Sequence, residues 1–113
     1  MIAANRTRRA TLRARRTQHQ ATAKIRRAGV ATLATHCLAA GLTIREARTV
    51  AGSLRRNAAK ANVTGQLGTS YAKRIPAHTC TRYTRAEVTR IAVIYRPRKP
   101  AYRTAAARLA LAA

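Results

Sequence analysis

Residues 41–62 read GLTIREARTVAGSLRRNAAKAN, and this stretch decides how the chain folds. Counting from Ile44, small or apolar residues recur at positions 44, 47, 51, 54, 58 and 61, and Val50 widens the stripe that they form. This alternation of three and four is typical of one buried face of an α-helix. Gly52 lowers the stability of such a helix by about 1 kcal/mol relative to Ala, but does not prevent it. The pattern predicts a helix that begins at about residue 44 and ends at Val63-Thr64-Gly65.

The chain has two acidic residues, and both stand in the same local motif. Thr43-Ile-Arg-Glu46 and Thr84-Arg-Ala-Glu87 fit the capping box, in which the threonine side chain accepts from the third helical amide and the glutamate accepts from the threonine amide. A carboxylate there also interacts favourably with the positive end of the helix dipole. Two helix starts, at about 44 and 85, therefore account for both acids. Since neither is left as a catalytic base, we expect a protein that is not an enzyme.

A shorter helix is predicted immediately upstream by the spacing of Val30, Leu33, Cys37 and Leu38. It ends at Ala40-Gly41-Leu42, and the capped basic helix follows after a turn of three to four residues. Two helices joined by a short turn with Gly resemble the helix-turn-helix family. The resemblance extends over about 25 residues of this sequence.

The residues that carry this resemblance lie around the turn. Gly41 stands in the turn, apolar Leu42 follows it directly, and the small Cys37 precedes it by four residues. Val50 is the apolar residue within the second helix. Ala47 departs from the pattern, because the family usually has a branched apolar residue at that position.

The resemblance implies that the start of the second helix enters the major groove of duplex DNA. The residues that would face the groove are Thr43, Arg45, Arg48 and Thr49. Those expected on the phosphate backbone are Arg55, Arg56 and Lys60. A plain helical hairpin would have the same apolar pattern, so the sequence leaves both interpretations open.

Residues 63–83 contain Gly65, Gly68, Ser70, Pro76 and several Thr, so we expect a loop there. A short pair of strands at 71–75 and 79–83 would make a small wing within it. The helix that starts after Thr84 should pack one apolar face against the first two helices. That face consists of Val88, Ile91, Ala92 and Tyr95.

The N-terminal arm, residues 1–28, contains eight Arg, one Lys and no acid. Four arginines at spacings of three and four share one helical face: Arg6, Arg9, Arg13 and Arg16. Because like charges at i and i+4 repel, we expect this helix to fray until it meets phosphate. A mitochondrial presequence has a similar composition, but here the basic excess continues to the C-terminus.

The C-terminal segment, residues 96–113, begins Arg-Pro-Arg-Lys-Pro, and its two prolines favour an extended path. It resembles the AT-hook, an Arg-Gly-Arg core flanked by proline that lies in a narrow minor groove, although the glycine is missing here. The resemblance implies DNA contacts by Arg96, Arg98 and Lys99. The other interpretation is a rigid basic linker that leads into a last helix at 101–112.

Cysteine usage does not indicate a metal site. Cys37 and Cys80 have His36 and His78 nearby, and four such ligands could bind zinc. Adjacent residues on a helix point about 100° apart, however, so His36 and Cys37 cannot easily share one metal. We expect two free, mostly buried thiols, no metal and no cofactor.

Composition bounds the fold and the partners. The 113 residues carry 24 Lys+Arg against two Asp+Glu, for a net charge of +22, and such a field attracts polyanions, of which nucleic acid is the commonest. Fourteen of the 19 Ile, Leu and Val lie between residues 30 and 95. We therefore expect a mainly all-α fold: a small helical domain at 29–95 with a helix-turn-helix-like core, and basic, partly disordered tails.

Together these patterns predict a non-enzymatic DNA-binding protein, a helix-turn-helix transcriptional regulator. The excess of Arg over Lys, 20 to 4, and of Ala resembles small basic DNA-binding proteins of GC-rich actinobacteria and their phages, which leaves both a bacterial and a phage-encoded protein open. Two alternatives stay open: a nucleoid-associated or DNA-packaging protein with little sequence preference, and an RNA-binding, ribosome-associated protein.

The expected partner is nucleic acid, with duplex DNA ahead of RNA, and we expect no small-molecule substrate. The sequence shows neither a secretory segment nor an apolar run long enough to cross a bilayer. We therefore expect a cytoplasmic, nucleoid-associated protein, and the sequence leaves its oligomeric state open.

Overall fold

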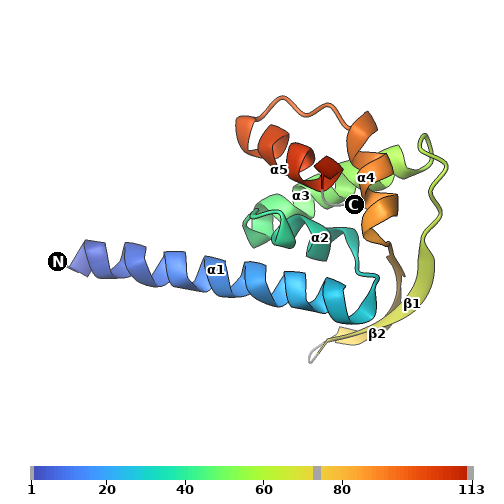
Figure 1. The fold of residues 1–113 in the computed structure, drawn as a ribbon. Helices are drawn as coiled ribbons and strands as arrows, with labels where there is room; N and C mark the ends of the chain where they lie inside the picture. Colours follow the sequence, from blue (N-terminus) through green and yellow to red (C-terminus); the bar gives the residue numbers. More distant parts are fainter. Residues whose placement is uncertain (1, 73–74, 112–113) are drawn as a thin grey trace.

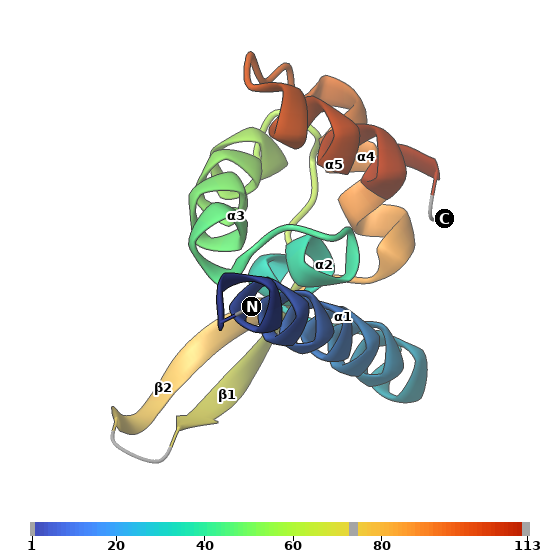
Figure 2. The same cartoon turned by 90° about the vertical axis from the view of Figure 1, so that its left-hand side faces the viewer.

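The computed structural model describes residues 2–72 and 75–111 of the chain. In order, these residues form α1 (Ile2–Ala28), α2 (Leu33–Ala39), α3 (Ile44–Ala58), β1 (Gln66–Ala72), β2 (Ile75–Arg82), α4 (Arg85–Ile94) and α5 (Pro100–Leu111). The fold is mainly helical, as the sequence predicts. Helices α2 to α5 form a cluster, α1 runs along α2 and extends past it, and the two strands leave the cluster as a hairpin (Figures 1 and 2).

Both capping boxes form, and the predicted helix starts are confirmed. At α3 the Glu46 amide donates to Thr43 Oγ1 at 3.2 Å, and the Thr43 amide donates to Glu46 Oε1 at 3.1 Å. At α4 the equivalent bonds between Thr84 and Glu87 measure 3.2 Å and 2.9 Å. Each pair satisfies two amides that have no partner inside the helix.

α2 is shorter than the sequence predicts, because it begins at Leu33 rather than near Val30. Thr32 is its N-cap and accepts a hydrogen bond from a first-turn amide. The end of α2 matches the prediction: Gly41 has a φ of 99°, which lets the chain reverse, and Leu42 behind it is buried.

α3 ends at Ala58, earlier than the predicted stop at residues 63–65. The Val63 amide returns to the Ala58 carbonyl at 3.0 Å, and the Asn62 amide to the Ala59 carbonyl at 3.2 Å. Asn62 has a φ of 56°, so this is a Schellman ending with Asn in the left-handed position. Val63 is buried, and its contact with the core favours the earlier stop.

The buried face of α3 agrees with the predicted stripe except at its first position. The buried residues are Ala47, Val50, Ala51, Leu54 and Ala58, and Ala61 packs against the same core. Ile44 is 57% exposed, although it begins the predicted stripe. Ile44 is the first residue of α3, and the core does not extend to this end of the helix.

The hydrophobic core extends beyond the predicted limits of 29–95. Ala21 and Ile25 of α1 are buried, and so are Ala105 and Leu109 of α5, which belong to the central cluster. The predicted core limits of 29–95 therefore leave out α5 and the end of α1 that packs against the body. Residues 2–16 of α1 are exposed, so only this part of the predicted arm stands clear of the body.

The predicted pair of strands is present, but the strands cover different residues from those predicted. β1 and β2 pair antiparallel from Gln66↔Arg82 to Ser70↔His78. The first strand thus starts earlier than the predicted 71–75, and residues 73 and 74 lie outside the described residues. An isolated bridge between Ala31 and residue 83 ties the end of the hairpin to the segment before α2.

The last two helices follow their predicted positions. Val88, Ile91 and Ala92 of α4 are buried, and Tyr95 packs against the core. α5 occupies Pro100–Leu111 where the sequence predicts 101–112, and residue 112 lies outside the described residues. α4 and α5 pack against each other, so α5 belongs to the helical cluster rather than to a separate tail (Figure 1).

Candidate nucleic-acid interface

α3 is held rigidly enough to present a fixed surface. Val50 and Leu54 are 0% exposed on its inner side, and the capping box fixes its first turn. Hydrogen bonds from Thr43 hold the pKa of Glu46 below its usual value, so this carboxylate stays charged at the positive end of the helix. The outer side of α3 therefore keeps its orientation relative to the core.

All seven candidates predicted on α3 and directly beside its ends are exposed: Thr43, Arg45, Arg48, Thr49, Arg55, Arg56 and Lys60. They do not all point the same way, because a helix advances about 100° per residue. Four of them share one side with Gly52 at its centre, and we call this side the α3 face. It consists of Arg45, Arg48, Thr49, Gly52 and Arg56.

Arg55 belongs to a different part of the surface from Arg56, although the sequence places both on phosphate. Arg55 lines a cavity of about 430 Å³ between α3, Thr32 before α2 and the hairpin residues Ser70 and His78. Arg56 instead donates to Ser53 Oγ at 3.1 Å, one turn back on its own helix. A guanidinium, an imidazole and hydroxyl groups meet at this cavity, and all of them can donate to a phosphate oxygen.

The arginines of the arm lie on α1, outside the helical cluster (Figure 1). Arg6, Arg9, Arg13 and Arg16 are exposed along one side, as their spacing predicts, and Arg8 and Arg15 add charge on another. The arginines of the arm therefore lie on a different helix from those of the α3 face.

Two basic residues of the Arg-Pro segment, residues 96–100, make contacts within the protein. The guanidinium of Arg96 donates to the carbonyls of Val93 and Tyr95 at the end of α4. Lys99 lies over the Tyr102 ring, 5.2 Å from its centroid, a geometry that a cation–π attraction favours. Arg98 is exposed. Of the three residues predicted to contact DNA, it is therefore the one most accessible to a partner.

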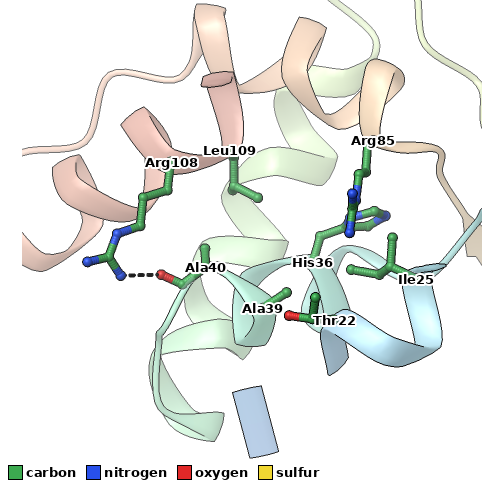
Figure 3. A pocket seen from close by; sticks show the side chains of 8 residues that line it. All are labelled: Thr22, Ile25, His36, Ala39, Ala40, Arg85, Arg108 and Leu109. Atoms are coloured by element: carbon green, nitrogen blue, oxygen red, sulfur yellow. Dashed lines mark hydrogen bonds between the residues drawn. The ribbon is translucent and has the colours of Figure 1, made fainter. Parts of the chain in front are cut away.

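A second cavity, of about 280 Å³, lies between α1, α2, α4 and α5 (Figure 3). Arg108 of α5 donates to the Ala40 carbonyl at 2.9 Å, and Gln18 of α1 donates to the Ala39 carbonyl at 3.1 Å. These carbonyls stand at the end of α2, where a cation is favoured by the helix dipole. Arg108 therefore serves to join α5 to α2.

His36 lines the same cavity and connects α2 to the end of the hairpin. It is 2% exposed, and its Nε2 lies 2.7 Å from the Tyr83 carbonyl, to which it donates. Burial lowers the pKa of this imidazole, and nearby Arg85 acts in the same direction. His36 is thus a neutral, hydrogen-bonded core residue.

The cysteines are free thiols. Cys37 is fully buried, and burial raises its pKa to about 12, so it behaves as a small apolar core residue. Cys80 is partly buried on the hairpin. Within residues 2–72 and 75–111, no group of three or more His, Cys, Asp and Glu gathers as a metal site would require.

Comparison with known proteins gives no relative: no protein-family model, no curated protein and no solved structure matches the chain. In the part of the chain that the structure describes, no helix is long and apolar enough to cross a membrane.

Three features of this surface were missed from the sequence. The cavity beside Arg55 depends on residues of the hairpin, more than ten positions away, and no local pattern indicates it. The role of Arg108 depends on a carbonyl 68 positions away. The central place of Gly52 on the exposed side could have been found by extending the helical periodicity from the buried stripe to the opposite face.

Proposed function

We propose that this chain is a DNA-binding protein of the helix-turn-helix class, in which α2 and α3 form the motif and the α3 face enters the major groove. The observation that carries the proposal is the α3 face. Three arginines and a threonine are exposed on one side of a helix whose other side is fixed in the core. Arginine suits this position because its planar fork matches the two acceptors of guanine in the major groove.

The charge of the whole molecule supports a polyanionic partner. Both acids of the chain are used within capping boxes, so carboxylates oppose the 24 basic residues only at two helix starts, and the net charge is +22. A field of one sign over a small protein steers it toward nucleic acid and accelerates association.

The arm and the hairpin supply the backbone contacts in this proposal. The six arginines between residues 6 and 16 bind phosphate without reading sequence. The cavity beside Arg55 offers its guanidinium, imidazole and hydroxyl donors to a phosphate next to the groove that α3 occupies. Separate phosphate and base contacts fit a transcriptional regulator, because phosphate contacts position a protein on DNA and base contacts specify its site.

A DNA-coating protein is the second candidate, and the exposed arm favours it. Residues 2–16 are exposed on all sides and present arginines in several directions, a surface that binds charge without a fixed register. In that role the α3 face would meet phosphate as well, and the protein would show little sequence preference.

Selection from random duplexes, followed by gel shifts on the selected site and on random duplex, separates the two. For a regulator, Arg45→Ala or Arg48→Ala should weaken binding to the selected site by about 1–3 kcal/mol and barely change binding to random duplex. Arg85→Ala removes one exposed charge on α4 and is the control, with equal small losses on both. If no motif is enriched and all three variants weaken both duplexes equally, the regulator is excluded in favour of coating.

The same gel shifts on single strands and on structured RNA, across a salt series with nonspecific competitor, test the choice of duplex DNA. The proposal expects the duplex to bind most tightly at each salt concentration. Tighter binding to structured RNA would overturn it and would favour the ribosome-associated alternative.

A further inference from the structure

The five glycines of the chain differ in why they are glycine. Three need a positive φ, and at a fourth the movable end of the Arg82 side chain occupies the space of a Cβ. In order these are Gly29, Gly41, Gly65 and Gly68. Gly52 has neither reason, because it lies within α3 and a Cβ built there would meet nothing within 4 Å.

A glycine in the middle of a helix is unfavourable in the free protein. It has more backbone freedom to lose on folding than any other residue, and alanine would fit this position without a clash. Folding alone therefore favours a side chain at Gly52. What glycine supplies is the close approach of something else to the helix backbone.

The neighbours of Gly52 indicate what approaches. Residues three and four positions away are its nearest neighbours on the helix surface, and they are Arg48, Thr49, Arg55 and Arg56. All four are exposed. A site without a side chain, bordered on the α3 face by two guanidinium groups and a hydroxyl, suits a polyanion. A second copy of this chain would bring the same arginines against one another, which like-charge repulsion opposes.

We propose that duplex DNA comes closest to the protein at Gly52, so that the middle of α3, rather than only its first turn, lies deepest in the groove. This inference rests on the proposed function. The missing Cβ lets the helix backbone approach the duplex, with Arg48 before and Arg56 after the point of closest approach. Gly52 is thereby a positioning residue, because it sets how deeply its neighbours reach.

The test is a series at this position, Gly52→Ala and Gly52→Leu, with two readouts on the full chain. Thermal melting of the free protein at high salt should rise for both variants, because both residues favour helix more than glycine does. Affinity for duplex should fall with side-chain size, by about threefold for Ala and more than tenfold for Leu, as overpacking at a close contact predicts. Ala86→Leu adds similar bulk on an exposed position of α4 and should leave affinity unchanged.

A rise in melting temperature together with a fall in duplex affinity distinguishes this role from a structural one. If both variants bind duplex as the natural chain does, the inference fails while the proposed function stands. If melting and affinity fall together, the loss of affinity reflects a damaged fold, and the inference fails. If the natural chain binds no duplex, both proposals fail. If the variants instead change the sedimentation of the free protein, Gly52 contacts a protein surface and the inference is overturned.

Discussion

The α3 face and the exposed part of α1 are both rich in arginine, yet they differ in how they are held. Behind the α3 face, Leu54 and its neighbours are buried, and a capping box fixes the first turn. Residues 2–16 of α1 are exposed on every side, so this stretch has charge without a fixed partner in the body. Arginine content predicts affinity for a polyanion, whereas packing behind the arginines decides whether they can discriminate between sequences.

Deletion of residues 1–16 should produce the largest change in binding. The cut leaves Gln18, which bonds to α2, and removes the six exposed arginines of the arm. Each lost phosphate contact removes about 0.9 from the slope of log affinity against log salt, so the slope should flatten by up to about 5. Gel shifts across a salt series would measure it, with equal losses expected on all duplex sequences. An unchanged slope would mean that the arm does not touch phosphate. The arm would then not be the region that binds duplex without regard to sequence.

Leu54→Ala should instead lower the stability of the helical body and leave the arm unaffected. Leu54 is 0% exposed behind the α3 face, and truncating such a side chain costs about 2–5 kcal/mol of unfolding free energy. Denaturant titration would show the loss, while Leu12→Ala on the exposed part of α1, where the leucine is 56% exposed, should change stability little. Equal effects at the two positions would show that the arm packs as tightly as the body.

The capping boxes should contribute less than the core does. Thr43→Ala removes the acceptor for the Glu46 amide at the start of α3 and should cost about 1 kcal/mol. Thr84→Ala is the matched change at α4, with the same bond at 3.2 Å. Thr11→Ala is the control on the arm, because its hydroxyl only returns to a carbonyl of its own helix. If melts at high salt show all three variants to be equally stable, the caps do not fix these helices.

The smallest effect concerns pH and should come from the body alone. Burial lowers the pKa of His36 in the folded protein; Arg85 adds to this shift, and the hydrogen bond to the Tyr83 backbone opposes it without reversing it. Below the usual histidine pKa of about 6.5, the unfolded chain binds a proton that the folded protein does not. Stability should therefore be unaffected by this group above about pH 6.5 and should fall as the pH drops below it.

Thermal melts between about pH 7.5 and 5.5 would show this decline, in a range where the carboxylates stay ionised. His78→Gln keeps His36 and should retain the decline. A melting temperature that stays constant across the range would contradict a buried, neutral His36.

Some of this molecule could be read from the sequence because the signals are local. A threonine followed three residues later by a glutamate specifies a helix start within one turn, and Thr43 and Thr84 mark the starts of α3 and α4 correctly. The stop at Gly41 and the break at Pro97 between α4 and α5 are local in the same sense. By contrast, the early end of α3 depends on Val63 reaching the core, so the predicted stop was several residues late.

The sequence by itself determined the charge of this protein, its helical class, the starts of α3 and α4 and the exposed basic side of α3, because these depend on composition and on neighbours within one helical turn. Tertiary structure decided the rest. It left Ile44 exposed, gave His36 its partner at Tyr83, placed Arg55 beside the hairpin and brought α5 into the core. Those outcomes require segments distant in the chain to meet, and their packing is settled only when the whole core is assembled.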